Sequence, residues 1–240
     1  MRIWELDVLR GIAIVMMVFF HIIFDLNVFF GFEQLHYNEG LLFYLGRIAA
    51  ILFIGLIGVA SSLIHKRHSD LQASAKNARR GLRLIGLGLI ITAITWFFAR
   101  ENTIWFGILH FLGLSILIVD PLVRYTKLNV ILAIPLLLAY YPMTYLWEGS
   151  YLTLIFGTVP ASFQSYDYYA LIPWLGYVLL GIALGNWLYK DGKPLIKRSP
   201  TLPEKALAWT GRKSLWIYMI HQPVLLGILY FLDGPLGMLS

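Results

Sequence analysis

LRGIAIVMMVFFHIIFDLNVFF, residues 9–30, is the stretch that decides the fold. It is apolar over a length that, wound as an α-helix, crosses a bilayer core of roughly 30 Å. We therefore predict a membrane-spanning helix. Its polar exceptions are Arg10, His21, Asp25 and Asn27. Placing an ionisable group at mid-membrane costs roughly 2.5–3.5 kcal/mol, so these side chains need a hydrated cavity or a partner on another helix.

His21 and Asp25 are four residues apart and therefore lie on one face of this helix. A carboxylate one turn from an imidazole can accept its N–H, fix the tautomer and raise its basicity, which makes a neutral histidine a general base. The alternative is a buried pair that only joins helices. Because intramembrane ionisable groups are by default functional candidates, we predict that this pair carries chemistry.

The composition of the whole chain is too apolar for a soluble domain. Its 240 residues are 59% hydrophobic and 13% charged, and the mean hydropathy is +0.72, which indicates an integral membrane protein. The absence of cysteine excludes disulfides, thiolate metal sites and a cysteine nucleophile. The first apolar run is too long for a cleavable signal peptide. The basic residues fall in short loops, so we expect no nucleic-acid partner.

Further apolar segments predict an all-α bundle of about seven membrane-spanning helices. The predicted spans are residues 9–30, 41–64, 84–99, 104–119, 129–146, 169–189 and 214–232. Polar, basic loops are expected at residues 65–83 and 190–213, with His65 and His68 as surface residues of the first. The number of spans stays open because residues 147–168 form either an outer loop or a re-entrant loop.

The basic residues predict the orientation of these helices. Of the 19 Lys and Arg, only Arg47 and Arg100 fall in segments that an alternating topology assigns to one side of the membrane. Because cytoplasmic loops are enriched in Lys and Arg, we predict a cytoplasmic N-terminus and a C-terminus on the far side. The chain is therefore expected to be a multi-pass protein of the cell membrane.

Other ionisable side chains lie at depths that overlap with the first pair. Arg47 and His110 come from the outer parts of two further spans, and His36 comes from the first outer loop. His221 lies deeper in the last span. Together they predict a hydrated cavity in the outer leaflet. The alternatives are that His110 only bonds a neighbouring helix and that Arg47 only neutralises Asp25.

Four stretches of sequence carry a resemblance to a known family. They are RIWELDVLRGIAIVMMVFFHIIFDLNVFF (residues 2–30), FGILHFLGLS (106–115), DYYALIPWLGYVLLGIALG (167–185) and GRKSLWIYMIHQPVL (211–225). In this order they resemble a small prokaryotic member of the heparan-α-glucosaminide N-acetyltransferase catalytic-domain family. Arg10 and His21 are also similar to the Arg-x10-His signature in the first helix of the bacterial membrane O-acyltransferases.

The resemblance implies a single transmembrane acyltransferase domain over residues 1–240. Such an enzyme takes an acetyl or other acyl group from cytoplasmic acyl-CoA and gives it to an acceptor, usually a sugar amine or hydroxyl, on the far side. Acetyl-CoA or another acyl-CoA is thus the expected co-substrate, and no metal is required. The expected partners are this donor, a sugar or glycan acceptor and membrane lipids, and a homo-oligomer is one alternative for the assembly.

The resemblance assigns the general base in two ways. In the lysosomal enzymes of the first family, an asparagine stands where His21 is, and the essential histidine lies further on, where His36 is the nearest candidate. In the O-acyltransferases, the essential histidine matches His21. We prefer His21 as the base because Asp25 is placed to orient it. Arg47 or His110 would then stabilise the developing oxyanion.

Basic residues on the predicted cytoplasmic side are candidates to bind the phosphates of coenzyme A through charge-assisted hydrogen bonds. They are Arg10, Arg79, Arg80, Arg83, Arg212 and Lys213, with His221 as a further cofactor-binding candidate. The alternative is that this cluster only sets the orientation and contacts anionic lipids.

A proton-coupled small-molecule transporter is the competing class of protein, because intramembrane His and Asp residues also serve as proton relays. The sequence lacks the paired, Gly- and Pro-broken helices in two corresponding halves that are typical of such transporters. A third alternative is an inert scaffold, which would keep the helices but need not keep these ionisable residues together.

Overall fold

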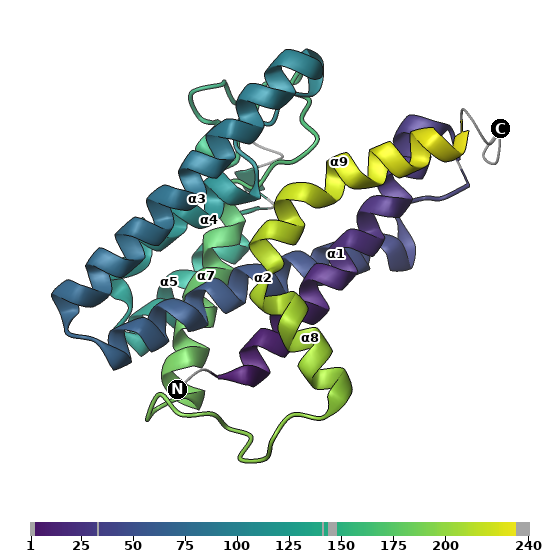
Figure 1. The fold of residues 1–240 in the computed structure, drawn as a ribbon. Coiled ribbons are helices and arrows are strands. Elements are labelled where there is room, and N and C mark those ends of the chain that lie inside the picture. Colours follow the sequence, from purple (N-terminus) through teal and green to yellow (C-terminus); the bar gives the residue numbers. More distant parts are fainter. Residues whose placement is uncertain (1–2, 33, 141, 144–147, 234–240) are drawn as a thin grey trace. The chain divides into compact units, whose positions relative to one another are not determined.

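The computed structural model describes residues 3–32, 34–140, 142–143 and 148–233, and these residues are built into helices and connecting turns (Figure 1). The α-helices are α1 (Trp4–Phe30), α2 (Gly40–Arg67), α3 (Asp70–Phe98), α4 (Ile108–Val119), α5 (Thr126–Leu138), α7 (Leu171–Leu188), α8 (Leu202–Arg212) and α9 (Ser214–Asp233). Short 3₁₀ turns occur at η1 (Arg100–Asn102), η2 (Asp120–Leu122) and η3 (Leu154–Phe156). The prediction of an all-α protein is confirmed.

Within the described residues, five helices are long and apolar enough to span a membrane, namely α1, α2, α3, α7 and α9. The predicted spans at residues 104–119 and 129–146 correspond to shorter apolar helices, α4 continued by η2, and α5. α5 ends at Leu138. Residues 141 and 144–146 of the predicted fifth span lie outside the described residues. The structure is thus that of an α-helical membrane protein.

The predicted polar loop at residues 65–83 is wrong. α2 continues to Arg67, and α3 already begins at Asp70. The stretch is rich in Ala, Lys and Arg, which are strong helix formers, and the long basic side chains can stay solvated while the backbone is helical. The polar residues therefore show only where the apolar parts of α2 and α3 end, and both helices extend beyond those points.

The predicted loop at residues 190–213 is wrong in its second half, which forms α8. Glu204, three residues after Thr201, accepts the Thr201 backbone N–H at 2.7 Å and closes the start of the helix. Arg198 donates to both carboxylate oxygens of Glu204, at 2.7 and 2.5 Å. These hydrogen bonds lower the pKa of Glu204 to about 2. The Thr-x-x-Glu spacing was the sequence signal for this helix.

The chain forms two compact units, which we describe separately. The terminal unit combines residues 1–53 with residues 194–240, and the central unit consists of residues 54–193. α1, α8 and α9 belong to the terminal unit, and α3, α4, α5 and α7 belong to the central unit. α2 contributes to both because the boundary follows Phe53.

In the terminal unit, α1 and α8 approach each other through two glycines. Gly11 of α1 lies against the Leu207 carbonyl, and Gly211 of α8 lies against the Asp7 carbonyl. A Cβ atom at either glycine would overlap the facing carbonyl oxygen. Only glycine therefore permits this approach of the two backbones, as in other closely packed helix pairs.

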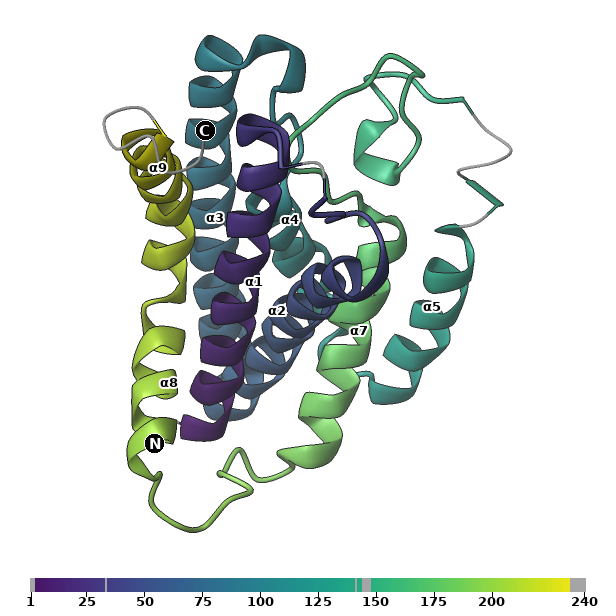
Figure 2. The same cartoon turned by 90° about the vertical axis from the view of Figure 1, so that its right-hand side faces the viewer.

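α1 and α9 of the same unit lie side by side and run in the same direction (Figure 2). Their contacts follow in ascending order along both helices: His21 with His221, Asp25 with Gln222, and Phe30 with Tyr230. Two parallel spans enter the membrane from the same side. If both helices span the bilayer, the number of crossings from α1 through α9 is therefore odd.

In the central unit, glycines again sit at helix crossings. A Cβ atom on Gly81 of α3 would lie 2.8 Å from the Gly113 carbonyl oxygen of α4, and one on Gly113 would lie 2.6 Å from the Gly81 oxygen. Gly58 of α2 lies against the Val178 carbonyl of α7. The fully buried side chains around these crossings include Phe111, Ile116, Leu179 and Ile182. Small residues thus allow close helix packing in this unit.

Asp120 in η2 joins α2 and α3 to the end of α4. It accepts hydrogen bonds from His65 Nε2 at 2.9 Å and from Asn77 Nδ2 at 2.7 Å. The expectation that His65 is a surface residue is wrong, because its side chain is only 8% exposed. The partner that buries it comes from 55 residues further along the chain, which spacing within one helix cannot reveal.

Candidate functional site

His21 lies in the second half of α1, and its side chain is half-buried. Its Nδ1 is 2.9 Å from the backbone carbonyl oxygen of Met17, one turn earlier, as expected for helical side chains that lean toward the helix N-terminus. A carbonyl oxygen can only accept a hydrogen bond, so in the neutral ring Nδ1 carries the hydrogen and Nε2 keeps a lone pair. The backbone thus fixes the tautomer of a potential base.

A second imidazole, that of His221 on α9, faces His21. The two ring centroids are 4.8 Å apart, and the ring planes meet at 85°. His221 Nδ1 is 2.6 Å from the Tyr218 carbonyl oxygen, so its neutral ring also keeps the lone pair on Nε2. That atom is buried and has no hydrogen-bond partner among the described residues. Two imidazoles with matching tautomers therefore lie edge to face in the terminal unit.

The expected hydrogen bond between Asp25 and His21 is not formed. Asp25 is fully buried, and its Oδ1 accepts from Gln222 Nε2 at 2.5 Å. The physical reason is that the Nδ1–H of His21 has the Met17 carbonyl as its acceptor, while α9 brings an amide donor to Asp25. The spacing predicted the shared face of the helix but not the hydrogen-bond partners.

Gln222 is the residue of this site that the sequence analysis missed. It is a polar side chain in an apolar span and directly follows His221, which was the available signal. Three buried atoms of the group lack a partner among the described residues: Asp25 Oδ2, His221 Nε2 and Gln222 Oε1. All three are hydrogen-bond acceptors in the assigned tautomers. The site is therefore complementary to a molecule that donates hydrogen bonds.

A cavity of about 230 Å³ lies beside His221 in the same unit. Its walls are formed by Val18, Ile217, Ile220, His221, Val224 and Leu225. The imidazole is the polar group in this lining, and every other side chain is aliphatic. The space next to His221 is therefore suited to an apolar group and unsuited to a charged one.

His36 and Arg47, two other predicted site residues, are exposed in the terminal unit. His36 lies between α1 and α2, in a segment that Asn27 holds by donating to the Phe32 and Leu35 carbonyls, each at 3.1 Å. The guanidinium of Arg47 lies 5.0 Å from the centroid of the Phe43 ring on the same helix, α2. Both side chains thus differ from the buried Asp25 and His221 in their access to solvent or lipid.

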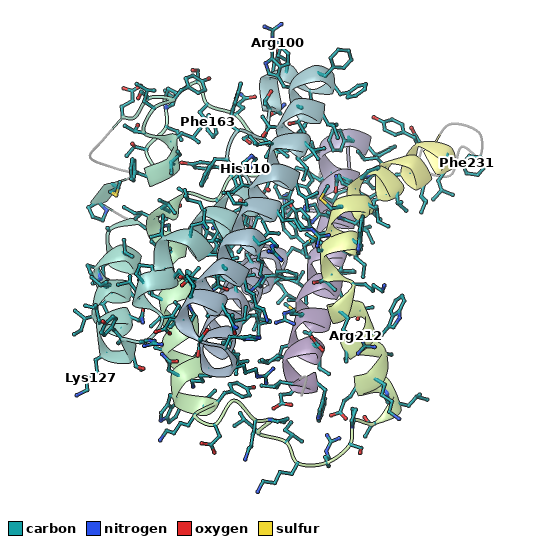
Figure 3. The ribbon with its side chains drawn as sticks, turned by 60° about the vertical axis from the view of Figure 1, so that its left-hand side comes forward. Arg100, His110, Lys127, Phe163, Arg212 and Phe231 are labelled. Carbon is teal, nitrogen blue, oxygen red and sulfur yellow. The ribbon has the colours of Figure 1, made fainter. Side chains whose placement is uncertain are left out.

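His110, the last predicted catalytic candidate, is buried on α4 of the central unit (Figure 3). Its Nε2 lies 3.3 Å from Thr92 Oγ1, and that hydroxyl donates to the Ile104 carbonyl at 2.6 Å. Thr92 is therefore the acceptor for His110. A Cβ atom on Gly88 would lie 2.9 Å from the His110 ring, so the ring fills the contact between α3 and α4. This arrangement fits a helix-joining role, and a catalytic role stays a prediction.

Two of the motif stretches meet at the start of α4. Asp167 Oδ2 accepts the backbone N–H of Ile108 at 2.9 Å, and the Tyr169 backbone N–H donates to the Phe106 carbonyl at 3.0 Å. The carboxylate satisfies a free N–H at the helix N-terminus, where negative charge is favoured. These contacts explain why the two stretches belong to one structural unit.

The candidate coenzyme A residues are divided between the two units. Arg10, Arg212, Lys213 and His221 belong to the terminal unit, and Arg79, Arg80 and Arg83 belong to α3 in the central unit. Arg10 Nη1 is 2.8 Å from Asp7 Oδ1, which neutralises part of its charge. Arg212 and Lys213 are exposed where α8 ends (Figure 3).

On α3, a cavity of about 390 Å³ is lined by Gln72, Ala75, Lys76 and Arg79. These residues recur every three or four positions and therefore share one helix face. Two cations and an amide along one wall form a surface that can bind phosphate oxygens. Arg79 is the predicted residue at this wall, and Lys76 is one that the sequence analysis did not single out.

Comparison with known proteins gives one family. The family model described as heparan-alpha-glucosaminide N-acetyltransferase, catalytic, matches residues 2–223. The match includes His21, Asp25, His221 and Gln222. No curated protein and no solved structure matches the chain significantly. Because the family match spans both units and nearly the whole sequence, the chain belongs to the heparan-α-glucosaminide N-acetyltransferase catalytic family.

Proposed function

We propose that this protein transfers an acetyl group from acetyl-CoA to an amine or hydroxyl of a sugar or glycan. The family is one of membrane acetyltransferases, and acetyl-CoA is its co-substrate. The observation that carries the proposal is the tautomer of His21, whose Nδ1–H is held by the Met17 carbonyl. A general base needs a free nitrogen in a fixed orientation, and His21 offers Nε2 in that way.

In the proposed reaction, His21 acts as the general base. Its Nε2 removes a proton from the acceptor as the acceptor nitrogen or oxygen attacks the thioester carbonyl carbon. The carbon–sulfur bond then breaks, and the imidazolium returns the proton to the departing sulfur, which releases free CoA. A positioned base of this kind contributes typically 10²–10⁴-fold to the rate. Asp25, one turn away, stabilises the imidazolium by its charge.

The general base and the donor to the oxyanion each have an alternative residue in this proposal. His36 is the alternative base, since it is exposed and lies on a segment anchored to the end of α1 by Asn27. Arg47, which lies in the same unit as His21, is the proposed donor to the oxyanion that develops on the thioester oxygen. His110, the alternative donor, belongs to the central unit, and its neutral ring gives its N–H to Thr92. Removing Arg47 should lower the turnover number, kcat, more than it raises the KM for acetyl-CoA.

We further propose that acetyl-CoA binds from the cytoplasmic side of a cell membrane and that the start of α1 lies on that side. The cations of α3 in the central unit are one proposed binding surface for the phosphates, and those near the end of α8 in the terminal unit are the alternative. The parallel course of α1 and α9 supports an odd number of crossings. We propose seven crossings, made by the five long helices together with α4 and α5.

A proton-coupled transporter is the second candidate. The observation that favours it is the set of buried acceptor atoms without partners on α1 and α9, Asp25 Oδ2 and His221 Nε2, because such atoms can carry protons through a membrane. A transporter has no need of acetyl-CoA. Binding of the thioester therefore separates the two functions.

The test uses the purified protein in detergent with acetyl-CoA as the probe and glucosamine, which offers both an amine and hydroxyls, as the acceptor. We expect saturable binding of acetyl-CoA and release of free CoA thiol that increases with glucosamine. Gln164→Ala is the control, since Gln164 is exposed on a loop outside the site and its loss should leave release unchanged. If acetyl-CoA shows no saturable binding and the protein carries protons across proteoliposomes, the transporter is the correct function and the acetyltransferase is not.

A further inference from the structure

We propose that Gln222 is a positioning residue. Its hydrogen bond to Asp25 sets the register of α9 on α1 and thereby holds the imidazole of His221 against that of His21. The expected effect on kcat rests on the proposed acetyl transfer. The expected effect on the position of His221 rests only on the geometry of the terminal unit.

The geometry of α9 restricts how it can make two contacts with α1 at the same time. His221 and Gln222 are consecutive, so their side chains leave the helix about 100° apart. Each nevertheless reaches α1, where His21 and Asp25 are one turn apart. Both contacts form together only over a narrow range of rotation and translation of α9. Loss of the Gln222 contact would therefore release His221 from its place.

α9 also carries a local weakness directly after this pair. Pro223 lies inside the helix, where it has no N–H to donate to the carbonyl one turn earlier, so the helix lacks one internal hydrogen bond. The ribbon of α9 bends along its length (Figure 1). A helix weakened here gains more from a side-chain anchor to its neighbour than an unbroken one does. Gln222 provides that anchor to a carboxylate that is fully buried.

The hydrogen bond is also worth more than a surface contact. It joins an amide to a carboxylate inside a membrane-spanning pair, where charge-assisted bonds are stronger than neutral ones. The second oxygen of each group, Asp25 Oδ2 and Gln222 Oε1, is buried without a partner among the described residues. The observed bond is thus the direct contact that holds these two side chains together, and its removal leaves Asp25 with neither oxygen paired.

The proposal is tested with Gln222→Leu, which keeps the side-chain size but removes the donor. We expect kcat for acetyl transfer to fall at least tenfold, with the KM for acetyl-CoA changed less than twofold. The matched control is Gln164→Leu on an exposed loop, which should leave both values unchanged. An unchanged kcat in Gln222→Leu would overturn the proposal.

An exchange of the two partners separates positioning from stability. The double variant Asp25→Asn with Gln222→Glu keeps one amide and one carboxylate of the original lengths, with donor and acceptor exchanged. The comparison variant is Asp25→Asn with Gln222→Leu, which also lacks the Asp25 carboxylate but cannot form the hydrogen bond. We expect kcat of the exchange to exceed kcat of this comparison variant. If the exchange raises only the unfolding temperature in detergent and not kcat over this comparison, Gln222 has only a structural role.

A spectroscopic measurement tests the positioning without any turnover. In protein labelled with ¹⁵N-histidine, the imidazole signals of His21 and His221 report their tautomers and mutual shielding. We expect both sets of signals to shift in Gln222→Leu and to stay in place in Gln164→Leu. Unshifted signals would refute the positioning role. Shifted signals in a protein without acetyl transfer would refute the proposed function and leave the positioning role supported.

Discussion

At the scale of single residues, the site depends on which atoms the backbone leaves free. The Met17 and Tyr218 carbonyls each take the Nδ1 hydrogen of one imidazole. The nitrogen that keeps a lone pair in both neutral rings is therefore Nε2. One helical turn of local geometry fixes this tautomer and needs no carboxylate. The spacing of His21 and Asp25 could therefore not reveal which group orients the His21 ring, and its role as a base stays a prediction.

We expect His21→Ala to lower acetyl transfer at least a hundredfold while acetyl-CoA binding changes little. The reason is that a base acts on the proton in the transition state and hardly contacts the bound thioester. Turnover and equilibrium binding of acetyl-CoA to the same detergent-purified variant would check both halves of this expectation. His36→Ala is the comparison variant. If it abolishes transfer and His21→Ala does not, His36 is the base.

At the scale of helices, packing is decided by glycines and by helix ends. The contact between α1 and α8 exists because Gly11 and Gly211 have no Cβ atom where a carbonyl lies. The sequence predicted close packing from small residues in a general way, but it could not say which glycine faces which carbonyl. That pairing depends on a partner about 200 residues away in the chain.

We expect Gly211→Ala to destabilise the protein by about 1–3 kcal/mol, because the added methyl group overlaps the Asp7 carbonyl and forces the two helices apart. Gly227→Ala on α9 is the matched control, since no other atom lies within 4 Å of a Cβ built there. It should be neutral or stabilising by roughly 0.5–1 kcal/mol. Thermal unfolding in detergent measures both. Equal unfolding temperatures for the two variants would contradict the close crossing.

Acid should reduce the stabilisation that Glu204 gives to the start of α8. Its pKa, held at about 2 in the folded protein by Arg198, lies below the value of roughly 4.3 for an unfolded glutamate. A lowered folded pKa means that the stabilisation is present above about pH 4.3 and is lost as the pH falls toward 2. We expect Glu204→Gln to lower the unfolding temperature at pH 7 and to match the unchanged protein near pH 2. A difference that grows on acidification would contradict this sign.

At the scale of the whole molecule, the sequence predicted the class of protein and the order of its helices because apolar length alone determines them. The predicted helix ends lie where the apolar residues end. The prediction therefore missed that α3 begins as early as Asp70, and it missed the amphipathic helix α8. It also missed contacts set by tertiary structure, such as His65 with Asp120 and Gln222 with Asp25. In each case the partner lies on another helix, outside the reach of local spacing.

The topology can be measured with single cysteines because the chain has none of its own. We expect Ser69→Cys to react with a membrane-impermeant thiol reagent only from the cytoplasmic side and Ser162→Cys only from the far side. Lys127→Cys decides between five and seven crossings. Cytoplasmic labelling means that α4 and α5 cross the membrane, and labelling from the far side means that they do not.

The most direct test of the central claim is acetyl transfer across a sealed membrane. The protein is reconstituted in proteoliposomes, with labelled acetyl-CoA on the side of Ser69 and glucosamine on the opposite side. We expect labelled acetyl-glucosamine to appear on the glucosamine side with the unchanged protein and not with His21→Ala. Equal product with His21→Ala, or no product from either side while acetyl-CoA stays unbound, would contradict a transmembrane acetyltransferase that uses His21 as its base.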